Sequence, residues 1–377
     1  MSIHMVLFVV LLNMSAFRGS KVLVSLFALE LGAPQIMLGV IVALYSLCPM
    51  LLAVYAGKLT DRIGVRWPLV LGSVGIALSL LLPGLLPSLN MLYVSAFLIG
   101  ASHVFYNISA QNLVGMLSTA ETSTRNFSNL SLTIAGSGFL GPLIAGPAID
   151  LFGHAVAYLC IAVTPLISAA IMYNARHRLG AMGGGKSRTD EAAVYAVGLF
   201  SNAPLRRILI TSGIILTAID LFQFYMPIYG HSIGLSASAI GTVLAMFAAA
   251  SFVVRTFMPR LVARFGAEQV LTGSIFIAAA TYLLFPLVES GVLLAAIAFL
   301  LGMGTGCGQP LTLMLAYDRA PAERSGEAMG LRMAINNLTH LAVPLFFGAL
   351  GTAVGLAPVF IANAAMLGVG GLISQRR

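Results

Sequence analysis

Long uninterrupted runs of apolar residues dominate this sequence, and each is about as long as a membrane-spanning helix. Hydrophobic residues make up 59% of the 377 residues and charged residues only 8%, whereas an ordinary soluble domain has about 25% charged residues. Because a helix needs about 20 apolar residues to cross the bilayer core, the chain has material for about eleven or twelve spans. This composition excludes a soluble enzyme.

The apolar runs predict helices rather than barrel strands, because the strands of a membrane barrel alternate apolar and polar residues. Between glycine, proline and charged residues we expect twelve helices, at residues 5–30, 36–57, 68–86, 91–113, 127–147, 155–174, 206–230, 237–258, 269–287, 291–315, 327–350 and 356–373. The predicted fold class is therefore an all-α polytopic membrane protein with twelve transmembrane helices.

The lysine and arginine residues are unevenly distributed over the predicted connections. With the N-terminus in the cytoplasm, the cytoplasmic connections and termini hold 16 of the 20 Lys and Arg residues, and the external connections hold none. Because Lys and Arg accumulate on the cytoplasmic side, we expect a bacterial-type inner (plasma) membrane protein with both termini cytoplasmic. The basic residues form short clusters between spans, which argues against a nucleic-acid partner.

The second half of the chain repeats the first at an offset of 202 residues. Nine pairs match at this offset: Gly39 with Gly241, Leu59 with Leu261, Arg62 with Arg264, Gly64 with Gly266, Gly100 with Gly302, Glu121 with Glu323, Pro142 with Pro344, Gly146 with Gly348, and Gly153 with Gly355. We therefore expect two pseudo-symmetric six-helix bundles, at 1–174 and 206–377, joined by a cytoplasmic central loop at 175–205. Transporters built from such repeats bind substrate between them, near mid-membrane.

Residues 57–66, Gly-Lys-Leu-Thr-Asp-Arg-Ile-Gly-Val-Arg, resemble the signature between the second and third spans of the major facilitator superfamily. Residues 259–266 resemble its degenerate second copy. The resemblance covers the whole chain and implies a transporter of that fold. It also implies that the spans at 5–30, 91–113, 206–230 and 291–315 line a central path.

The residues of this signature also suggest a conformational latch. Gly57 and Gly64 allow close approach and a sharp turn. Asp61, Arg62 and Arg66 can form a charge network that breaks when the two halves move. The alternative is a solvated turn whose charges only set the orientation of the chain, because exposed ion pairs contribute little.

Residues 136–146 are similar to the Gly-Pro signature of antiporters in the same superfamily. Within this segment we expect Gly141, Pro142 and Gly146 to serve in helix packing or gating, and ordinary helix packing is the alternative. The arginine that the superfamily carries in the span at 91–113 is replaced by Ala96. This departure argues against a proton relay copied from the drug antiporters.

Asp220 is the only acidic residue deep within a predicted span, and Arg18 occupies the equivalent position one repeat earlier. An ionisable side chain at mid-membrane costs at least about 2.5 to 3.5 kcal/mol, so each needs a partner or a function. We hypothesise that Asp220 couples protons to transport, alternating between pairing with Arg18 and Lys21 and binding a proton. The alternative is a permanent buried ion pair.

Other polar residues on the path-lining and flanking spans extend this site. The predicted substrate-binding residues are Arg18, Lys21, His103, Asn107, Gln223, Gln309, Asn336 and His340. The alternative for His103 and His340 is packing, because a lone histidine in a helix is more often a packing residue than a ligand. Arg255 and Arg332 lie toward the predicted cytoplasmic ends of their spans, where snorkelling to the membrane surface is the simplest interpretation.

The excess of positive charge in the predicted path favours an anionic substrate. We therefore predict a secondary active transporter, proton-coupled, that moves a small organic anion by alternating access. The alternative is a multidrug or metabolite efflux antiporter of broad specificity. The sequence contains no zinc-protease, phosphate-loop or nucleophile-elbow motif. We therefore expect no enzyme activity, no cofactor and no metal, and a monomer whose partners are substrate, protons and lipid.

Overall fold

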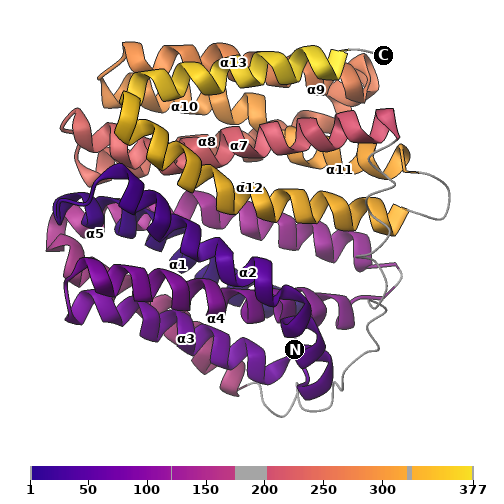
Figure 1. Cartoon of the computed structure of the whole chain (residues 1–377). Helices are drawn as coiled ribbons and strands as arrows, with labels where there is room; N and C mark the ends of the chain where they lie inside the picture. The colour runs from indigo at the N-terminus through magenta and orange to yellow at the C-terminus, as the bar shows by residue number, and fades with distance from the viewer. Residues whose placement is uncertain (1, 120, 175–201, 321–324, 376–377) are drawn as a thin grey trace.

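The computed structural model describes residues 2–119, 121–174, 202–320 and 325–375, and nearly all of them are helical (Figure 1). The helices are α1 Ile3–Glu30, α2 Gln35–Ile63, α3 Arg66–Leu85, α4 Leu89–Met116, α5 Ser123–Asn174, α7 Ala203–Ser232, α8 Ala237–Phe265, α9 Ala267–Leu284, α10 Gly291–Gly306, α11 Gly308–Asp318, α12 Ser325–Val354 and α13 Leu356–Gln375, with a short 3-10 turn, η2 Phe285–Leu287. The described residues contain no strand.

Eleven helical stretches of the described chain are long and apolar enough to cross a membrane. One of them, residues 125–174 of α5, has 50 residues, which corresponds to about 75 Å and more than twice the hydrocarbon core of a bilayer. At Gly153 the backbone turns sharply, with φ 77°, so α5 consists of two helices joined by a kink. The described chain therefore contains the twelve spans expected from the sequence, with α10 and α11 forming one of them.

The sharp turns between spans reproduce the repeat. Every glycine of positive φ among the described residues belongs to a pair separated by 202 positions: Gly32 and Gly234, Gly64 and Gly266, and Gly153 and Gly355. Glycine adopts this left-handed conformation without the Cβ clash that other residues suffer. The two halves therefore change direction at equivalent residues.

Helix packing within the halves follows the same repeat. A Cβ atom on Gly100 of α4 would lie 2.7 Å from the carbonyl oxygen of Tyr45 in α2. One on Gly302 of α10 would lie 2.3 Å from the carbonyl oxygen of Phe247 in α8. Only glycine permits these approaches of α4 to α2 and of α10 to α8.

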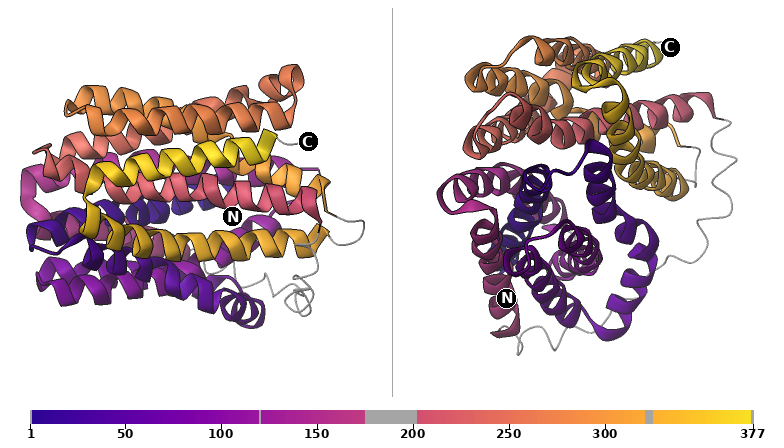
Figure 2. Two further views of the ribbon diagram at one scale, coloured as in Figure 1. Left: turned by 45° about the horizontal axis from the view of Figure 1, so that its top comes forward. Right: turned by 60° about the vertical axis from the view of Figure 1, so that its left-hand side comes forward.

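Helices α1–α5 pack largely on one another, as do α7–α13, and the pairs α5 with α8 and α2 with α12 join the two groups. Figure 2 shows the two groups side by side. This packing supports the proposed division into bundles at 1–174 and 206–377. The expected central loop at 175–205 lies almost entirely outside the described residues.

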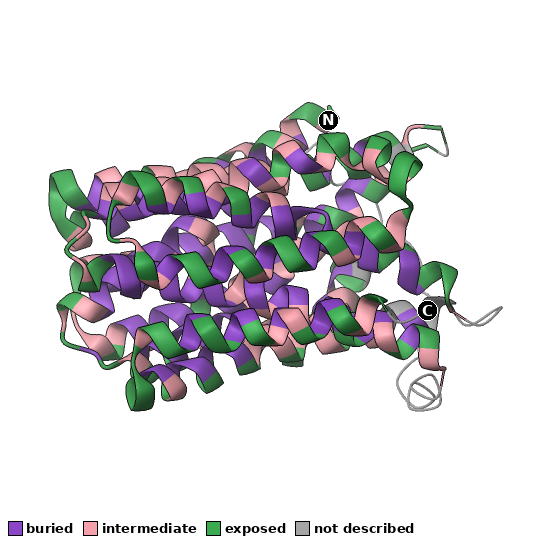
Figure 3. Ribbon diagram, turned by 90° about the horizontal axis from the view of Figure 1, so that it is seen from above, coloured by how far each residue is buried: buried purple, intermediate pink, exposed green. Residues whose placement is uncertain are grey.

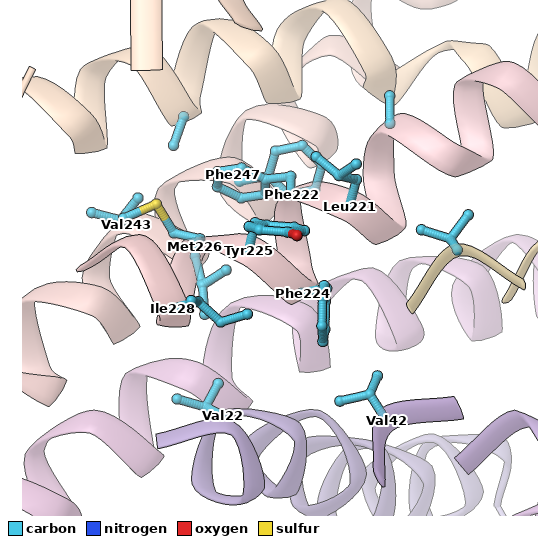
Figure 4. Packing of buried hydrophobic residues seen from close by; sticks show 14 of the residues in the cluster. Val22, Val42, Leu221, Phe222, Phe224, Tyr225, Met226, Ile228, Val243 and Phe247 are labelled. Atoms are coloured by element: carbon cyan, nitrogen blue, oxygen red, sulfur yellow. The ribbon is translucent and has the colours of Figure 1, made fainter. Parts of the chain in front are cut away.

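Apolar side chains cover the outside of the bundle as well as filling its interior. Leu71, Leu151 and Phe346 are exposed, and Figure 3 shows exposed residues along the outer faces of the helices. Such a surface suits contact with lipid rather than water. Inside, Phe222 of α7 packs against Phe247 of α8, with ring centroids 4.7 Å apart (Figure 4). This contact packs α7 against α8.

The predicted latch differs in part from the structure. Gly57 lies inside α2, which continues to Ile63, so the turn is confined to Gly64 and Val65. An isolated glycine costs a helix only about 1 kcal/mol relative to alanine, so α2 continues through Gly57. Arg62 lies in the last turn of α2. The side chain of Asp61 lies outside the described residues, so the latch stays a prediction.

Arg66 begins α3, and its guanidinium carbon lies 4.8 Å from the centroid of the Trp67 ring and 5.8 Å from that of Tyr173. A cation stacked on aromatic faces is held in place without an ion pair. These contacts fix Arg66 beside the turn in which the latch was predicted.

Candidate functional site

A cavity of about 510 Å³ lies between the two groups of helices. Its walls come from α1, α4 and α5 on one side and from α7, α8, α10, α11 and α12 on the other. We call the end of the bundle at which α1 begins and α13 ends the terminal end, which lies to the right in Figure 1. The cavity reaches from mid-bundle at Lys21 and Leu244 to Gln111, Phe127 and Arg255, which lie nearer the terminal end.

At the opposite end the two groups of helices touch through the same contact made twice. A Cβ atom on Gly241 of α8 would lie 2.4 Å from the carbonyl oxygen of Pro142 in α5. One on Gly39 of α2 would lie 2.3 Å from the carbonyl oxygen of Pro344 in α12. These residues are related by the offset of 202, so the repeat generates two equivalent close contacts between the halves. We call this region the closed end.

Hydrogen bonds at the closed end also follow the repeat. The Asp150 carboxylate accepts hydrogen bonds from the backbone N–H groups of Ala237, at 3.0 Å, and Ser238, at 2.7 Å, in the first turn of α8. At the equivalent place, the Thr352 hydroxyl oxygen accepts one from the Ile36 N–H at 3.1 Å, in the first turn of α2. Each half thus caps a helix N-terminus of the other.

Asp150→Ala should weaken the closed end. Loss of a helix cap costs about 0.5 to 2 kcal/mol, which corresponds to a roughly 2- to 30-fold shift toward separation of the halves. Spin-label distances across the closed end of the protein in nanodiscs would measure this shift. Glu289→Ala removes an exposed acid near the same end and is the matched control. Identical distance distributions for the two variants would contradict the prediction.

The predicted residues on α5 divide between two partners. A Cβ atom on Gly141 would lie 2.7 Å from the Cβ of Arg18 and 2.8 Å from the backbone nitrogen of Gly19, so Gly141 seats α1 within its own half. Pro142 and Gly146 instead face α8: a Cβ on Gly146 would lie 2.5 Å from the Ala237 carbonyl oxygen. The segment therefore combines packing within one half with contact between the halves.

Arg18 and Lys21 both line the cavity from α1. The Arg18 Nη1 donates a hydrogen bond to Gln223 Oε1 in α7 at 3.3 Å, across the boundary between the halves. The Lys21 Nζ lies 5.3 Å from the ring centroid of Phe17 and 5.9 Å from that of Tyr45. An aromatic face and an amide oxygen carry no formal negative charge, so neither contact neutralises its cation.

Asp220 also lines the cavity, but its partner is not the one that the sequence suggested. Its Oδ2 lies 2.5 Å from Nδ1 of His340 in α12. Among the described residues, no salt bridge joins Asp220 to Arg18 or Lys21. The offset of 202 places Arg18 and Asp220 at equivalent positions along their helices, but it does not fix the direction in which each side chain leaves its helix. The permanent Arg18–Asp220 ion pair is therefore absent from this conformation.

Gln309 and Asn336 bring further polar groups to the cavity. The buried Gln309 Nε2 and Asn336 Oδ1 have no hydrogen-bond partner among the described residues. Buried polar groups without partners are uncommon in folded proteins. These two atoms are therefore candidates for contact with a bound molecule.

Arg332 does not snorkel as its position in the sequence suggested. It is only 7% exposed, and its Nη2 donates to the side-chain oxygen of Gln309 at 2.6 Å and to the Thr312 hydroxyl at 3.2 Å. The short helix α11 supplies both acceptors inside the protein, so the guanidinium does not need the membrane surface. Arg332 thereby orients the Gln309 side chain.

Arg255 also differs from its simplest interpretation, because snorkelling does not predict its contact with the cavity. Arg255 lines the cavity, and its Nε donates to the carbonyl oxygen of Gly306 at 3.0 Å. The only signal in the sequence was a lone charge within an apolar run. Gln111, Ser131 and Ser251 line the same cavity and were not among the predicted site residues.

His103 and Asn107 of α4 are not among the residues that line the cavity. The His103 ring stacks on that of Phe17, with centroids 3.8 Å apart and an interplanar angle of 13°. Asn107 is half-buried on the same helix. The structure therefore groups six of the eight predicted substrate-binding residues, together with Asp220, around one cavity.

The described residues contain no group of three or more His, Cys, Asp or Glu side chains arranged to hold a metal ion. Charged side chains of both signs line the cavity. They comprise the cations Arg18, Lys21 and Arg255 and the carboxylate of Asp220, which is paired with His340.

Comparison with known proteins places these features in a family. The sequence matches the model of the Major Facilitator Superfamily over residues 6–338 and 208–375. It is 21% identical over 361 residues to an uncharacterized MFS-type transporter of Methanocaldococcus jannaschii, covering 94% of this chain and 92% of the relative. It is 22% identical over 319 residues to the class B tetracycline resistance protein of Escherichia coli, covering 83% and 78%.

Solved structures of low sequence identity share the fold. A peptide transporter POT in complex with sulfate superposes with a TM-score of 0.81 at 14% identity, covering 99% of this chain and 93% of the other. The nucleoside transporter NupG gives a TM-score of 0.82 at 11% identity, covering 99% and 98%.

Proposed function

The chain belongs to the major facilitator superfamily, and from this premise we propose that it is a secondary active transporter that moves a small organic anion in exchange for, or together with, protons. The observation that carries the proposal is the charge of the cavity wall. Arg18, Lys21 and Arg255 line it, and none is in a salt bridge with a described residue. Because charge in a membrane interior is costly, unpaired cations there favour a ligand that brings negative charge.

The conformation supports alternating access around this cavity. The halves are in contact at the closed end, and the cavity extends from mid-bundle toward the terminal end. We propose that the terminal end faces the cytoplasm, because the connections and termini at that end carry most of the Lys and Arg residues. The structure then corresponds to the inward-facing state, and the outward-facing state requires the two contacts at Gly39 and Gly241 to separate.

The Asp220–His340 pair is the proposed site of proton coupling. The Asp220 side chain is 13% exposed and that of His340 39% exposed, so the cavity gives solvent access to the pair. A proton taken up by either residue adds one positive charge beside Arg18 and Lys21. Anion binding and proton binding would therefore reinforce each other through the charge of one shared cavity.

A second candidate function is efflux of drugs or metabolites with broad specificity. The relatives support it: besides the class B protein, the sequence resembles the multidrug resistance protein MdtG of Dickeya zeae, with 20% identity over 334 residues. The cavity argues for the anion, because a site for cationic drugs would need carboxylates in excess. Asp220 is the only carboxylate among its described lining residues.

Counterflow in proteoliposomes would separate the two functions. Radiolabelled organic anions should exchange in the wild type, whereas cationic dyes should not. Arg18→Gln should weaken anion binding by about 10- to 100-fold, because a hydrogen bond to a charged group contributes about 1.5 to 3 kcal/mol. Arg125→Gln, which removes an exposed arginine from α5, is the matched control. Undiminished anion affinity in Arg18→Gln would show that Arg18 is not the anchor.

A further inference from the structure

The cations of the cavity stand on opposite halves of the protein. Arg18 and Lys21 belong to α1, and Arg255 belongs to α8. All three line the one cavity of about 510 Å³, a volume in the range of pockets that enclose a small molecule. A ligand in this cavity therefore meets positive charge from both halves.

Arg255 is held ready to bind an anion. Its Nε donates a hydrogen bond to the Gly306 carbonyl oxygen. Its terminal nitrogens have no hydrogen-bond partner among the described residues. A Cβ atom on Gly306 would lie 2.6 Å from Val254 Cγ1 and 2.8 Å from Ser251 Cα, so only glycine lets the end of α10 approach α8 this closely. The remaining guanidinium edge matches a carboxylate or phosphate group.

The α1 side of the cavity offers a second group of cations, and we call Arg18 with Lys21 one pole of the cavity and Arg255 the other. The Arg18 guanidinium is steadied by Gln223 at 3.3 Å, and the Lys21 ammonium rests against the rings of Phe17 and Tyr45. Neither contact supplies negative charge. The two poles therefore differ in their neighbours but share the need for an anionic partner.

The charges of the lining residues favour a ligand with more than one negative charge. Arg18, Lys21 and Arg255 contribute three positive charges, and Asp220 contributes one negative charge. With His340 uncharged, the lining side chains carry a net charge of plus two, and the buried Arg332 guanidinium, hydrogen-bonded to the lining residue Gln309, is a further cation behind the wall. A monoanion would leave one pole without a counterion, whereas a dianion would neutralise both.

We propose that the substrate is a small organic dianion with an anionic group at each end, such as an aliphatic dicarboxylate, bound by Arg18 and Lys21 at one end and by Arg255 at the other. The inference rests on the proposed transport of an organic anion and names its class. Because the two poles belong to different halves, such a ligand links α1 to α8. Binding therefore favours approach of the halves at the terminal end, which a monoanion cannot bring about in this way.

The test uses ligands of one chain length that differ in charge. Purified full-length protein would be titrated with succinate, its monoamide succinamate and butanoate, and the Kd of each read from ligand-induced thermal stabilisation. The wild type should bind succinate at least about tenfold more tightly than either monoanion, the effect expected of one additional charged hydrogen-bonding pair. Arg255→Gln should remove this preference and leave the monoanion affinities within about twofold.

Two further variants separate binding from folding. Arg260→Gln removes an exposed arginine of α8 and should keep the preference for succinate. Arg255→Lys keeps the positive charge but not the paired N–H groups of the guanidinium, so it should restore part of the preference for succinate. Equal binding of succinate and succinamate by the wild type, or a preference that survives in Arg255→Gln, would overturn the dianion proposal and leave anion transport standing. Binding of cationic dyes with no anion bound would overturn the proposed function itself.

Discussion

The double substitution Gly39→Ala and Gly241→Ala should reduce transport by more than tenfold. Each new Cβ atom would lie within 2.4 Å of a backbone carbonyl oxygen, that of Pro344 or that of Pro142. Backbone cannot move aside as a flexible side chain can, so the clash is relieved only if the halves separate. Overpacking costs of about 1 to 3 kcal/mol at each site would shift the equilibrium far from the closed end.

Counterflow of the transported anion would measure the loss of transport in this double variant. Spin-label distances across the closed end would measure the separation of the halves. Each single variant should show a smaller effect in the same direction, because the two contacts are equivalent but separate. Gly273→Ala in α9 is the control, since a Cβ atom there meets no atom within 4 Å. Wild-type exchange together with wild-type distances in the double variant would contradict a role for these glycines in closing that end.

The two contacts at Gly39 and Gly241 show what the sequence repeat could and could not provide. The offset of 202 paired Gly39 with Gly241 and Pro142 with Pro344. It could not show that each glycine meets the proline of the other half, because a repeat relates equivalent residues rather than residues in contact. The structure adds that each glycine packs against the proline of the other half.

The fold was predictable because apolar runs of about 20 residues identify the membrane spans. Lipid leaves no choice but helix for long apolar runs, and the turns at Gly64 and Gly153 require the positive φ that glycine adopts most readily. Gly57 was predicted wrongly as part of the turn, because the sequence alone does not distinguish a tolerated helix glycine from a glycine that ends a helix. The helix boundary depends on the backbone beyond it.

The candidate site was predictable in its residues and not in its pairings. Charges kept in apolar runs identified Arg18, Lys21 and Asp220. The partner of each charge depends on the direction of its side chain, which the sequence does not show. In the structure, Gln223 is the neighbour of Arg18, and His340 is the neighbour of Asp220. The sequence predicts snorkelling for Arg255, because depth along the helix is the only criterion that the sequence provides. Its contact with the cavity depends on how closely α10 packs against α8.

Asp220→Asn should abolish anion accumulation driven by a pH gradient while leaving exchange of the anion intact. Exchange needs only binding and the movement of the two halves, whereas accumulation needs a group that carries a proton through the cycle. The asparagine removes the negative charge beside Arg18 and Lys21, so anion affinity should stay the same or increase. Proteoliposomes with an imposed pH gradient would measure accumulation, and counterflow at equal pH would measure exchange.

The comparison with His340→Gln distinguishes coupling from charge balance. Glutamine cannot take up a proton, but it leaves the Asp220 carboxylate in place, so accumulation should persist with an altered dependence on pH if Asp220 is the carrier. Asp318→Asn, which removes an exposed acid at the end of α11, should behave as the wild type. Accumulation that is unchanged in Asp220→Asn would remove this residue from the coupling step. Only its contribution to the charge of the cavity would then remain, and the proton would have to be carried by another group.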